Sequence, residues 1–340
     1  MLSSLKDQEH HVPNHPSVNP LLPTPCALLF AAGNADTILR MKTELISRRK
    51  FLTASGALLA SHGALGQKTL LTAGEVLERM KANVGIPWLS DTMKTTVDNL
   101  LGGDASTPVQ GIATTTMATI DVMRTAIDKG LNMIVSHETP FYLHQDKTDD
   151  LKDDAVLSYK LDYMRKNKIV VLHWHDHWHR RTPDGSAYGM MNEVGWEKYS
   201  DSPDKKHFTL PPQTLARFAK ELEQKLQLHN VRVIGKPDME VSKVYSNWGF
   251  AKREVVISIL NRPDVDTLVT GESVEWEGIP YVQDMVAMGQ KKALVLLGHV
   301  NSENGGMRYC AEWIRGFIHE VPIGFVPAPE PFWPPDHPIG

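Results

Sequence analysis

An α/β fold is predicted by three features of the sequence. Residues 111–117, 119–129 and 131–135 read as strand, helix and strand, which is the length of a βαβ unit. Buried-type strands at 169–172 and 293–297 each lead into a further helical segment or loop. The strands at 131–135, 169–172 and 293–297 all run straight into histidines. Because such sheets bind ligands at the carboxyl ends of their strands, we expect a site where these strands end.

The remaining elements follow from periodicity and turn residues. Apolar residues at three- and four-residue spacing predict helices at 72–81 (with Thr72 as N-cap), 156–167, 213–228 and 307–318, and one ending over 284–289. Gly130 is expected to end the helix 119–129. Short β-prone runs predict strands at 231–234, 243–246 and 267–270. Irregular chain is expected at 98–103 (a turn-rich loop), 146–154 (a solvated acidic loop), 180–209 (an excursion over the site) and from Pro322 onward (an extended, Pro-rich tail).

The composition is that of an ordinary globular protein. The 340 residues are 41% hydrophobic and 22% charged, with a formal net charge of -4, which suits one large domain or two smaller ones. The absence of a basic excess argues against a nucleic-acid partner. Only two cysteines occur, Cys26 and Cys310, so a disulfide framework and a thiolate-rich metal site are both excluded. Any metal must therefore be held by histidine and carboxylate.

The N-terminal region looks like an export signal. Arg48 and Arg49 precede Phe-Leu and the small, weakly apolar run 53–60, as in bacterial twin-arginine signals, and the run is too short for a confident membrane span. We expect a signal peptide over 41–66, export machinery of that route as a partner, and a periplasmic or other extracytoplasmic location. Residues 1–40 fit no such pattern, so we expect translation to start at Met41 and residues 1–40 to be a non-native or disordered extension.

The densest chemistry lies at the end of the strand 169–172. His173, His175, His177 and His179 alternate with Trp174, Asp176 and Trp178. In an extended chain all four imidazoles would line one face. A single histidine in such a place is best interpreted as part of a polar, pH-sensitive loop. Four of the 15 histidines within seven residues favour metal binding or catalysis.

Two other strand ends carry possible ligands. His137 and Glu138 follow the strand 131–135, and His299 and Glu303 follow the strand 293–297. His299 and Glu303 are four residues apart, so both can turn toward one point where a loop enters a helix. Alone this pair is a weak signal, and together with two other histidine-bearing strand ends it is much stronger.

From Val76 to Phe317 the sequence resembles the NIF-three-like dinuclear metal centre hexameric protein family, some members of which are catalogued as type 2 GTP cyclohydrolase I-like. The motifs that carry the resemblance are Asp98-Asn-Leu-Leu-Gly, Ser136-His137-Glu138-Thr-Pro140, the strand and loop 169–179, residues 226–235, Thr270-Gly271-Glu272 and Gly298-His299-Val-Asn-Ser-Glu303. The resemblance implies a NIF-three-like α/β fold of two lobes with the metal site between them, over residues 67–325, before a tail at 326–340. It also implies a homohexamer.

Carried over by position, the resemblance implies a metal site of one or two divalent first-row ions (Zn, Fe, Mn or Ni) whose ligands are His137, Glu138, His175, His179, His299 and Glu303. The sequence departs from the family at three positions. His179 stands where the family has an aspartate, Glu138 stands where it has a second histidine, and Trp276 stands where it has a histidine. Either Glu138 or Glu303 can take over as bridging carboxylate, and a single metal remains an alternative. Asp176 is expected to orient a ligand imidazole.

These features predict a metal-dependent hydrolase of the cell envelope that activates a water molecule and acts on a small molecule. A non-ligating histidine, His173 or His177, or Glu272, is expected to act as general base or acid. The tryptophans at 174, 178 and 276 are expected to wall the pocket or simply to pack. GTP is not expected to be the substrate, since nucleoside triphosphates are scarce outside the cytoplasm. The alternative is a non-catalytic metal-binding or metal-handling protein.

Overall fold

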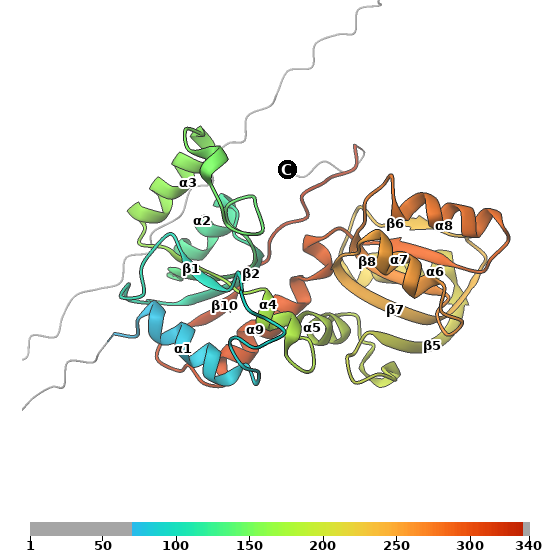
Figure 1. The fold of residues 1–340 in the computed structure, drawn as a ribbon, viewed down its shortest axis with the longest axis horizontal. Coiled ribbons are helices and arrows are strands. Elements are labelled where there is room, and N and C mark those ends of the chain that lie inside the picture. Colours follow the sequence, from blue (N-terminus) through green and yellow to red (C-terminus); the bar gives the residue numbers. More distant parts are fainter. Residues whose placement is uncertain (1–69, 336–340) are drawn as a thin grey trace, which may run out of the picture. The chain divides into compact units, whose positions relative to one another are not determined.

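The computed structural model describes residues 70–335, which form two five-stranded sheets covered by helices (Figure 1). The expected extension at 1–40 and the expected signal peptide at 41–66 lie outside the described residues. Among residues 70–335, no helix combines the length and apolar character that crossing a membrane requires.

The first sheet has the strand order β1-β4-β3-β2-β10. All its pairs are parallel except β1 with β4. Its strands are β1 (Asn99–Leu101), β2 (Ile112–Met117), β3 (Met133–Glu138), β4 (Val170–His173) and β10 (Ile323–Phe325). One face packs on α1 (Ala73–Asn83) and α9 (Asn304–Arg315), and the other on α2 (Ile120–Asp128) and α3 (Ala155–Lys166) (Figure 1). Side chains alternate between the two faces, so Val135 joins the core under α1 and α9 while Ile134 joins the core under α2 and α3.

The second sheet has the order β5-β7-β8-β9-β6, with a parallel centre and antiparallel strands at both edges. Its strands are β5 (His207–Thr214), β6 (Arg232–Ile234), β7 (Glu240–Phe250), β8 (Thr267–Glu272) and β9 (Ala293–Leu296). Val269 and Val295 share a core with α6 (Leu215–Leu226) and α5 (Gly185–Glu193). Leu268 and Leu294 face α7 (Arg253–Leu260) and α8 (Gly278–Ala287). Both sheets are therefore the middle layer of an α/β/α sandwich.

The second sheet is inserted into the first lobe, because α5 precedes it in the chain while α9 and β10 follow it and return to the first sheet. Helices α5 and α9 contact each other at backbone distance. A Cβ on Gly189 would lie 2.6 Å from the Cα of Gly306, and one on Gly306 would lie 2.7 Å from the Cα of Ser186. Small residues are therefore required where the two helices meet.

Several short elements complete the fold: α4 (Asp176–Arg180) and the single turns of 3₁₀ helix η1 (Asp149–Leu151), η2 (Glu197–Tyr199) and η3 (Val300–Ser302). The predicted helices and buried strands are present, with Thr72 capping α1 and Gly130 at φ 73° just after α2. The expectation of irregular chain over 180–209 is wrong, because the buried helix α5 and the start of β5 lie there. The loop predicted at 98–103 contains strand β1, and helix α7 was not predicted.

The chain after Pro322 is also more ordered than the expected tail. Residues Ile323–Phe325 pair with β2 as an edge strand, and Val326 and Ala328 are buried. Glu330 accepts a hydrogen bond from the side chain of Asn230. Proline is tolerated there because an edge strand needs only part of its backbone hydrogen bonds. Residues 336–340 lie outside the described part of the chain.

Candidate metal centre

Asp98 determines the shape of the histidine-rich segment. Its carboxylate accepts hydrogen bonds from the backbone N–H groups of His175 (2.7 Å), Asp176 (2.8 Å) and His177 (2.9 Å). These bonds satisfy N–H groups that a helix start leaves without partners, and the chain turns into α4 directly after Trp174. The expectation that all four imidazoles line one face of an extended chain is therefore wrong. His175 and His179, four residues apart, instead lie on the same side of a helical turn.

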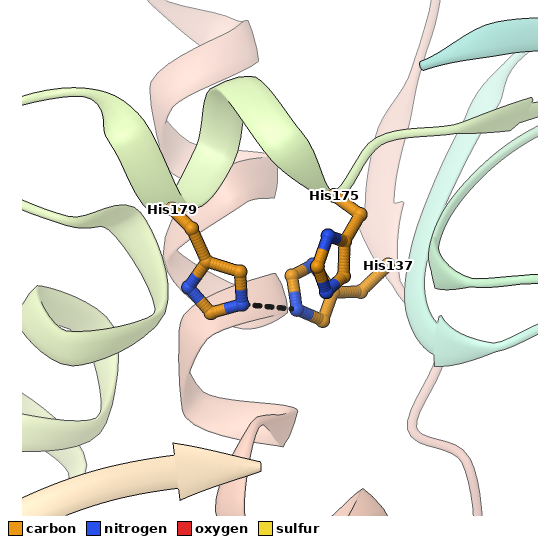
Figure 2. Close-up of side chains that lie close together, drawn as sticks. All are labelled: His137, His175 and His179. Carbon is orange, nitrogen blue, oxygen red and sulfur yellow. Dashed lines mark hydrogen bonds between the residues drawn. The ribbon is translucent and has the colours of Figure 1, made fainter. Parts of the chain in front are cut away.

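The rings of His137, His175 and His179 lie together, and the first projects from the end of β3 (Figure 2). The Nδ1 atom of His137 donates to the carbonyl oxygen of Trp174 at 3.2 Å, and Nδ1 of His179 donates to Asp184 Oδ2 at 3.2 Å. Asp184 also caps α5 by accepting from the backbone of Ala187. In each ring Nδ1 is held by an oxygen, so Nε2 is the nitrogen that faces the cluster.

The same arrangement recurs at the other two imidazoles. Nδ1 of His299 donates to Glu272 Oε1 at 2.9 Å, and Nδ1 of His175 donates to Asp176 Oδ1 at 3.1 Å, as expected for Asp176. Hydrogen bonds of this kind are typical of metal-ligating histidines, whose second nitrogen is held by a carboxylate or carbonyl oxygen.

The Nε2 atoms converge on the carboxylate of Glu303, which is 1% exposed. Nε2 of His137 lies 3.1 Å from Nε2 of His179 and 3.2 Å from Glu303 Oε1, and Nε2 of His179 lies 3.7 Å from the same oxygen. Atoms bound to one zinc-like ion at about 2.0–2.2 Å are roughly 3.3–3.5 Å apart in tetrahedral geometry. The three atoms therefore lie close to the separations that a shared cation requires.

The other oxygen of Glu303 faces a second group of donors. Nε2 of His299 lies 3.3 Å from Glu303 Oε2 and 3.2 Å from Glu138 Oε1, while Nε2 of His175 lies 3.9 Å from Glu138 Oε1. Glu303 thus offers one oxygen to His137 and His179 and the other to His299. The geometry gives it the position of a bridging carboxylate between two groups of ligands.

The electrostatics of the cluster favour a cation. Burial lowers the pKa of His299, but hydrogen bonds from its ring to Glu138 and Glu272, together with the nearby negative charge of Glu303, outweigh burial and raise that pKa to about 12. Burial raises the pKa of Glu138, but the bond from His299 and the charge of His137 lower it to about 2. Burial likewise raises the pKa of Glu303, and the charge and hydrogen bond of His137 bring it well below its usual range. The carboxylates of Glu138 and Glu303 are therefore ionised at neutral pH, and a bound cation would compensate their negative charge.

Two further observations show that the residues fit a metal. Glu303 Oε2 is buried and makes no hydrogen bond of acceptable geometry, although His299 lies near it. A Cβ on Gly249 would lie 2.6 Å from Glu303 Oε1 and 3.5 Å from His299 Nε2, so glycine leaves room beside the carboxylate. The donor set of imidazoles and carboxylates suits a divalent first-row ion.

The structure separates the residues expected to act as acid or base. His177 is buried, with Nδ1 at 2.5 Å from Asp98 Oδ2 and Nε2 at 2.8 Å from the carbonyl oxygen of Trp88, so both nitrogens are engaged away from the cluster. His173 is also buried, and its Nδ1 donates to Asp146. Glu272 lies at the cluster with its side chain 49% exposed. Its bond to His299 makes it the orienting partner of that ring.

The three tryptophans expected at the pocket differ in how far they are buried. Trp174 and Trp178 are 0% exposed and belong to the core of the first lobe, whereas Trp276 is 81% exposed. The first two therefore pack and do not form a substrate-stacking surface.

A cavity of about 390 Å³ reaches the cluster from the surface and is lined by Thr92, Met93, Lys94, Thr95, His175, Asp176, His179 and Arg180. Arg180 donates to the hydroxyl of Thr92 at 3.0 Å, which fixes its guanidinium at the rim. Two ligand imidazoles thus form part of the wall, and two cationic side chains lie beside them.

Sequence reasoning missed four residues of the site. Asp98 was assigned only to a loop motif, and Asp146 to a solvated acidic loop. Asp184 stands between a proline and a glycine, and an aspartate at such a position is a sequence signal for the N-cap of a helix. His144, whose ligand atom lies within 4.8 Å of those of His175 and Asp176, is a single histidine in a loop and gives no signal in the sequence.

Fold and site together define an α/β protein of two lobes with a histidine–carboxylate site suited to divalent metal, at strand carboxyl ends of both sheets. The sequence profile of Duf34/NIF3 (NGG1p interacting factor 3) matches residues 92–331. The chain belongs to the Duf34/NIF3 family, as the sequence motifs indicated. No curated protein matches the sequence.

Solved structures agree on the fold. Staphylococcus aureus protein SA1388 is similar with a TM-score of 0.59 at 16% identity, over 77% of this chain and 98% of that one. A Bacillus cereus protein related to NIF3 gives 0.58 at 14% identity over 75% and 96%. The protein TTHA1606 from Thermus thermophilus gives 0.56 at 18% identity over 77% and 100%. The predicted NIF-three-like fold class is confirmed.

Proposed function

We propose that this protein is a metal-dependent hydrolase. The observation that carries the proposal is the shared orientation of His137, His175, His179 and His299, each with Nδ1 held by an oxygen and Nε2 turned toward Glu138 or Glu303. Imidazoles held in this way are prepared to ligate a metal rather than to pack. The six expected ligands lie in this one cluster.

The two oxygens of Glu303 support a site for two ions, one at His137 and His179 and the other at His299 and Glu138. A bound zinc, iron, manganese or nickel ion would lower the pKa of a bound water molecule toward neutrality. Glu272 holds the Nδ1 proton of His299 and is itself half exposed, so it is placed to exchange protons with groups at the cluster rim.

The cavity suggests a small anionic substrate. Lys94 and Arg180 lie on the same wall as His175 and His179, and Arg180 is held in place by Thr92. An arginine fixed in this way favours a phosphate or carboxylate group because its guanidinium can donate two parallel hydrogen bonds. We therefore propose a phosphate ester or a carboxylate-bearing ester or amide as the substrate class.

The test uses metal-stripped protein reloaded with one metal at a time and incubated with p-nitrophenyl phosphate, bis-p-nitrophenyl phosphate and the carboxylate-bearing ester mono-p-nitrophenyl succinate. Turnover should require metal, stop on addition of chelator and be lost in His137→Ala. The control His319→Ala changes an exposed histidine that has no place in the cluster and should leave turnover unchanged. Metal-loaded protein that hydrolyses none of these compounds would count against a hydrolase.

A non-catalytic metal-handling protein is the second candidate. It is favoured by the enclosure of two central ligands, since His137 is 0% and Glu303 1% exposed. A closed set of protein ligands holds metal without leaving a position for substrate. Stoichiometric metal binding with no turnover of any of the three esters would support this candidate. GTP remains an unexpected substrate, and metal-dependent GTP turnover by the pure protein would overturn that expectation.

We further propose that the protein is exported and folds before export, on the basis of Arg48, Arg49 and the apolar run that follows them. Replacing both arginines by lysine should keep the protein in the cytoplasm, as measured by cell fractionation and immunoblotting. Unchanged export of the double variant would contradict the proposal.

The hexamer is also a proposal that follows from the resemblance. Trp276 (81% exposed) and Phe332 (70% exposed) are large apolar side chains that contact with further copies of the chain would bury. Light scattering after size exclusion should give six times the mass of the mature chain.

A further inference from the structure

The loop after β3 places His144 beside the side chains of the candidate metal centre. The backbone is left-handed at Tyr142 (φ 70°) and at Asp146 (φ 58°), so the loop turns sharply on either side of His144. Asp146 closes the loop by accepting from the hydroxyl of Thr139 at 2.5 Å and from Nδ1 of His173 at 2.7 Å. The His144 ring packs edge-on against His175 at 4.7 Å between ring centroids.

This corner of the site brings together three side chains that can ligate a metal and one buried nitrogen without a hydrogen-bond partner. The ligand atoms of His144, His175 and Asp176 all lie within 4.8 Å of one another. His173, whose ring centroid is 5.6 Å from that of His144, is fully buried, and its Nε2 has no hydrogen-bond partner. Because Nδ1 of His173 donates to Asp146, Nε2 is the nitrogen left without a partner. An uncompensated buried group of this kind indicates that something else belongs nearby.

We propose that His144, His175 and Asp176 form an additional binding site for a zinc-like divalent cation, distinct from the ligand groups around Glu303. Nδ1 of His175 and Oδ1 of Asp176 are 3.1 Å apart, which is close to the roughly 3.3 Å between two ligands of one zinc ion. Two imidazoles, one carboxylate and an open position form a typical zinc site with room for water or substrate. His175 and Asp176 also line the cavity, so an ion held by them would lie beside it.

This outer site does not remove ligands that the inner cluster needs. His137, His179 and His299 with Glu138 and Glu303 already provide two groups of donors around Glu303. The two nitrogens of His175 face different groups, with Nδ1 at Asp176 and Nε2 toward Glu138. An ion at the outer site would replace the Nδ1 proton that now lies between His175 and Asp176. The site does not depend on hydrolase activity.

The competing explanation is that Asp176 only orients His175. The two explanations differ at His144, whose contact with His175 is edge-on ring packing and which orienting by Asp176 does not require. His144→Ala is therefore the deciding variant, and it is expected to fold because the ring is half-buried in a loop. Asp176→Asn is the second variant, since its amide oxygen can still accept from the backbone N–H of Val97, as Asp176 Oδ2 does at 3.1 Å.

The test is to strip the full chain of metal, dialyse it against buffers of fixed free zinc and count ions per chain by elemental analysis. At saturating zinc, His144→Ala and Asp176→Asn should each hold one ion fewer than the unaltered protein, while His319→Ala matches it. Crystals soaked in zinc should show an anomalous peak at bonding distance from the His144 ring. An unchanged zinc count in His144→Ala, or no peak at His144, would overturn the outer site.

The results for the outer site can be distinguished from the results for the proposed hydrolase activity. Loss of the inner ions in His137→Ala with the outer ion retained would support the outer site whether or not any ester is hydrolysed. Conversely, ester turnover with an unchanged zinc count in His144→Ala would leave the hydrolase standing and remove the outer site alone.

Discussion

The two sheets contribute to the metal centre in the same way but with different chemistry. In the first lobe, β3 and β4 lead to His137, Glu138, His175 and His179, so this lobe supplies three imidazoles and one carboxylate. In the second, β8 ends at Glu272 and β9 is followed by His299 and Glu303, so this part of the chain supplies one imidazole and two carboxylates. Most of the imidazoles thus come from one sheet, and two of the three carboxylates come from the other.

Neither sheet supplies the full ligand set alone, and buried carboxylates without a counter-charge are costly. Glu303 connects the two sets, because its Oε1 faces His137 and His179 from the first lobe and its Oε2 faces His299. Metal binding should therefore depend on this carboxylate more than on any single imidazole.

The largest effect is expected for Glu303→Gln, which removes the charge that both ligand groups share. Metal affinity should fall by more than about 100-fold, since loss of an outer hydrogen-bond partner alone costs about 10–100-fold. Competition with a metal-sensitive chelator measures the affinity. Glu312→Gln, an exposed change on the same helix, is the control and should bind metal normally. Equal affinities for the two variants would show that the two groups of donors do not act together.

Asp98→Ala tests whether the shape of the first lobe's ligand segment depends on one carboxylate. The change leaves the backbone N–H groups of His175, Asp176 and His177 without their acceptor and frees the His177 ring. The free energy of unfolding should fall by about 3 kcal/mol, and metal affinity should fall although no ligand is changed. Urea unfolding and metal titration measure the two effects. Asp91→Ala, at an exposed position, should change neither.

Gly189→Ala tests the contact that joins α5 to the start of α9, just beyond Glu303. The added methyl group would lie 2.6 Å from the Cα of Gly306, so the helices must move apart. We expect a loss of about 2 kcal/mol in unfolding free energy. Gly324→Ala adds the same methyl group at an ordinary 3.4 Å from Leu131 and should change stability little. Thermal unfolding of the two variants that gives the same loss would contradict this account of the helix contact.

The smallest effect is expected from pH in the metal-free protein. The pKa of Glu138 is about 2 when folded against an ordinary 4.5, so its stabilising contribution is full above about pH 4.5 and is lost as the pH falls through about 2. The raised pKa of His299, about 12 against 6.5, has the opposite sign: its contribution is full below pH 6.5 and is lost as the pH rises toward 12. Glu138→Gln should flatten the acid side of the urea-stability curve. Curves of identical slope for both proteins would exclude this role of Glu138.

Much of the site could be predicted because its ligands follow buried strands. His137, His299 and Glu303 come directly after such strands, and parallel strands bring their carboxyl ends to one edge. The orientation of the histidine-rich segment could not be predicted, because it depends on Asp98, which lies 77 residues before His175. Histidines at every second position fit a strand. Hydrogen bonds to the carboxylate of Asp98 instead begin a helix at this segment.

The fold was predictable to the same extent. Helices with one exposed face, such as α6, show clear periodicity in Leu215, Phe218 and Leu222. Helix α5 was missed because Gly185, Gly189, Met190 and Met191 are all buried, so its sequence has no polar face to alternate with. Its glycines resemble those of a loop until the partner helix α9 is known.

The insertion of the second sheet has a consequence for synthesis. The first sheet is completed only when β10 pairs with β2, which joins Ile323 to Ile112, and when α9 covers the core. A nascent chain therefore emerges with its three imidazoles first, then makes the whole inserted lobe, and only afterwards provides the bridging carboxylate and the strand that closes the first sheet. Bringing such distant segments together is slow. The metal site can therefore be completed only when translation has nearly ended.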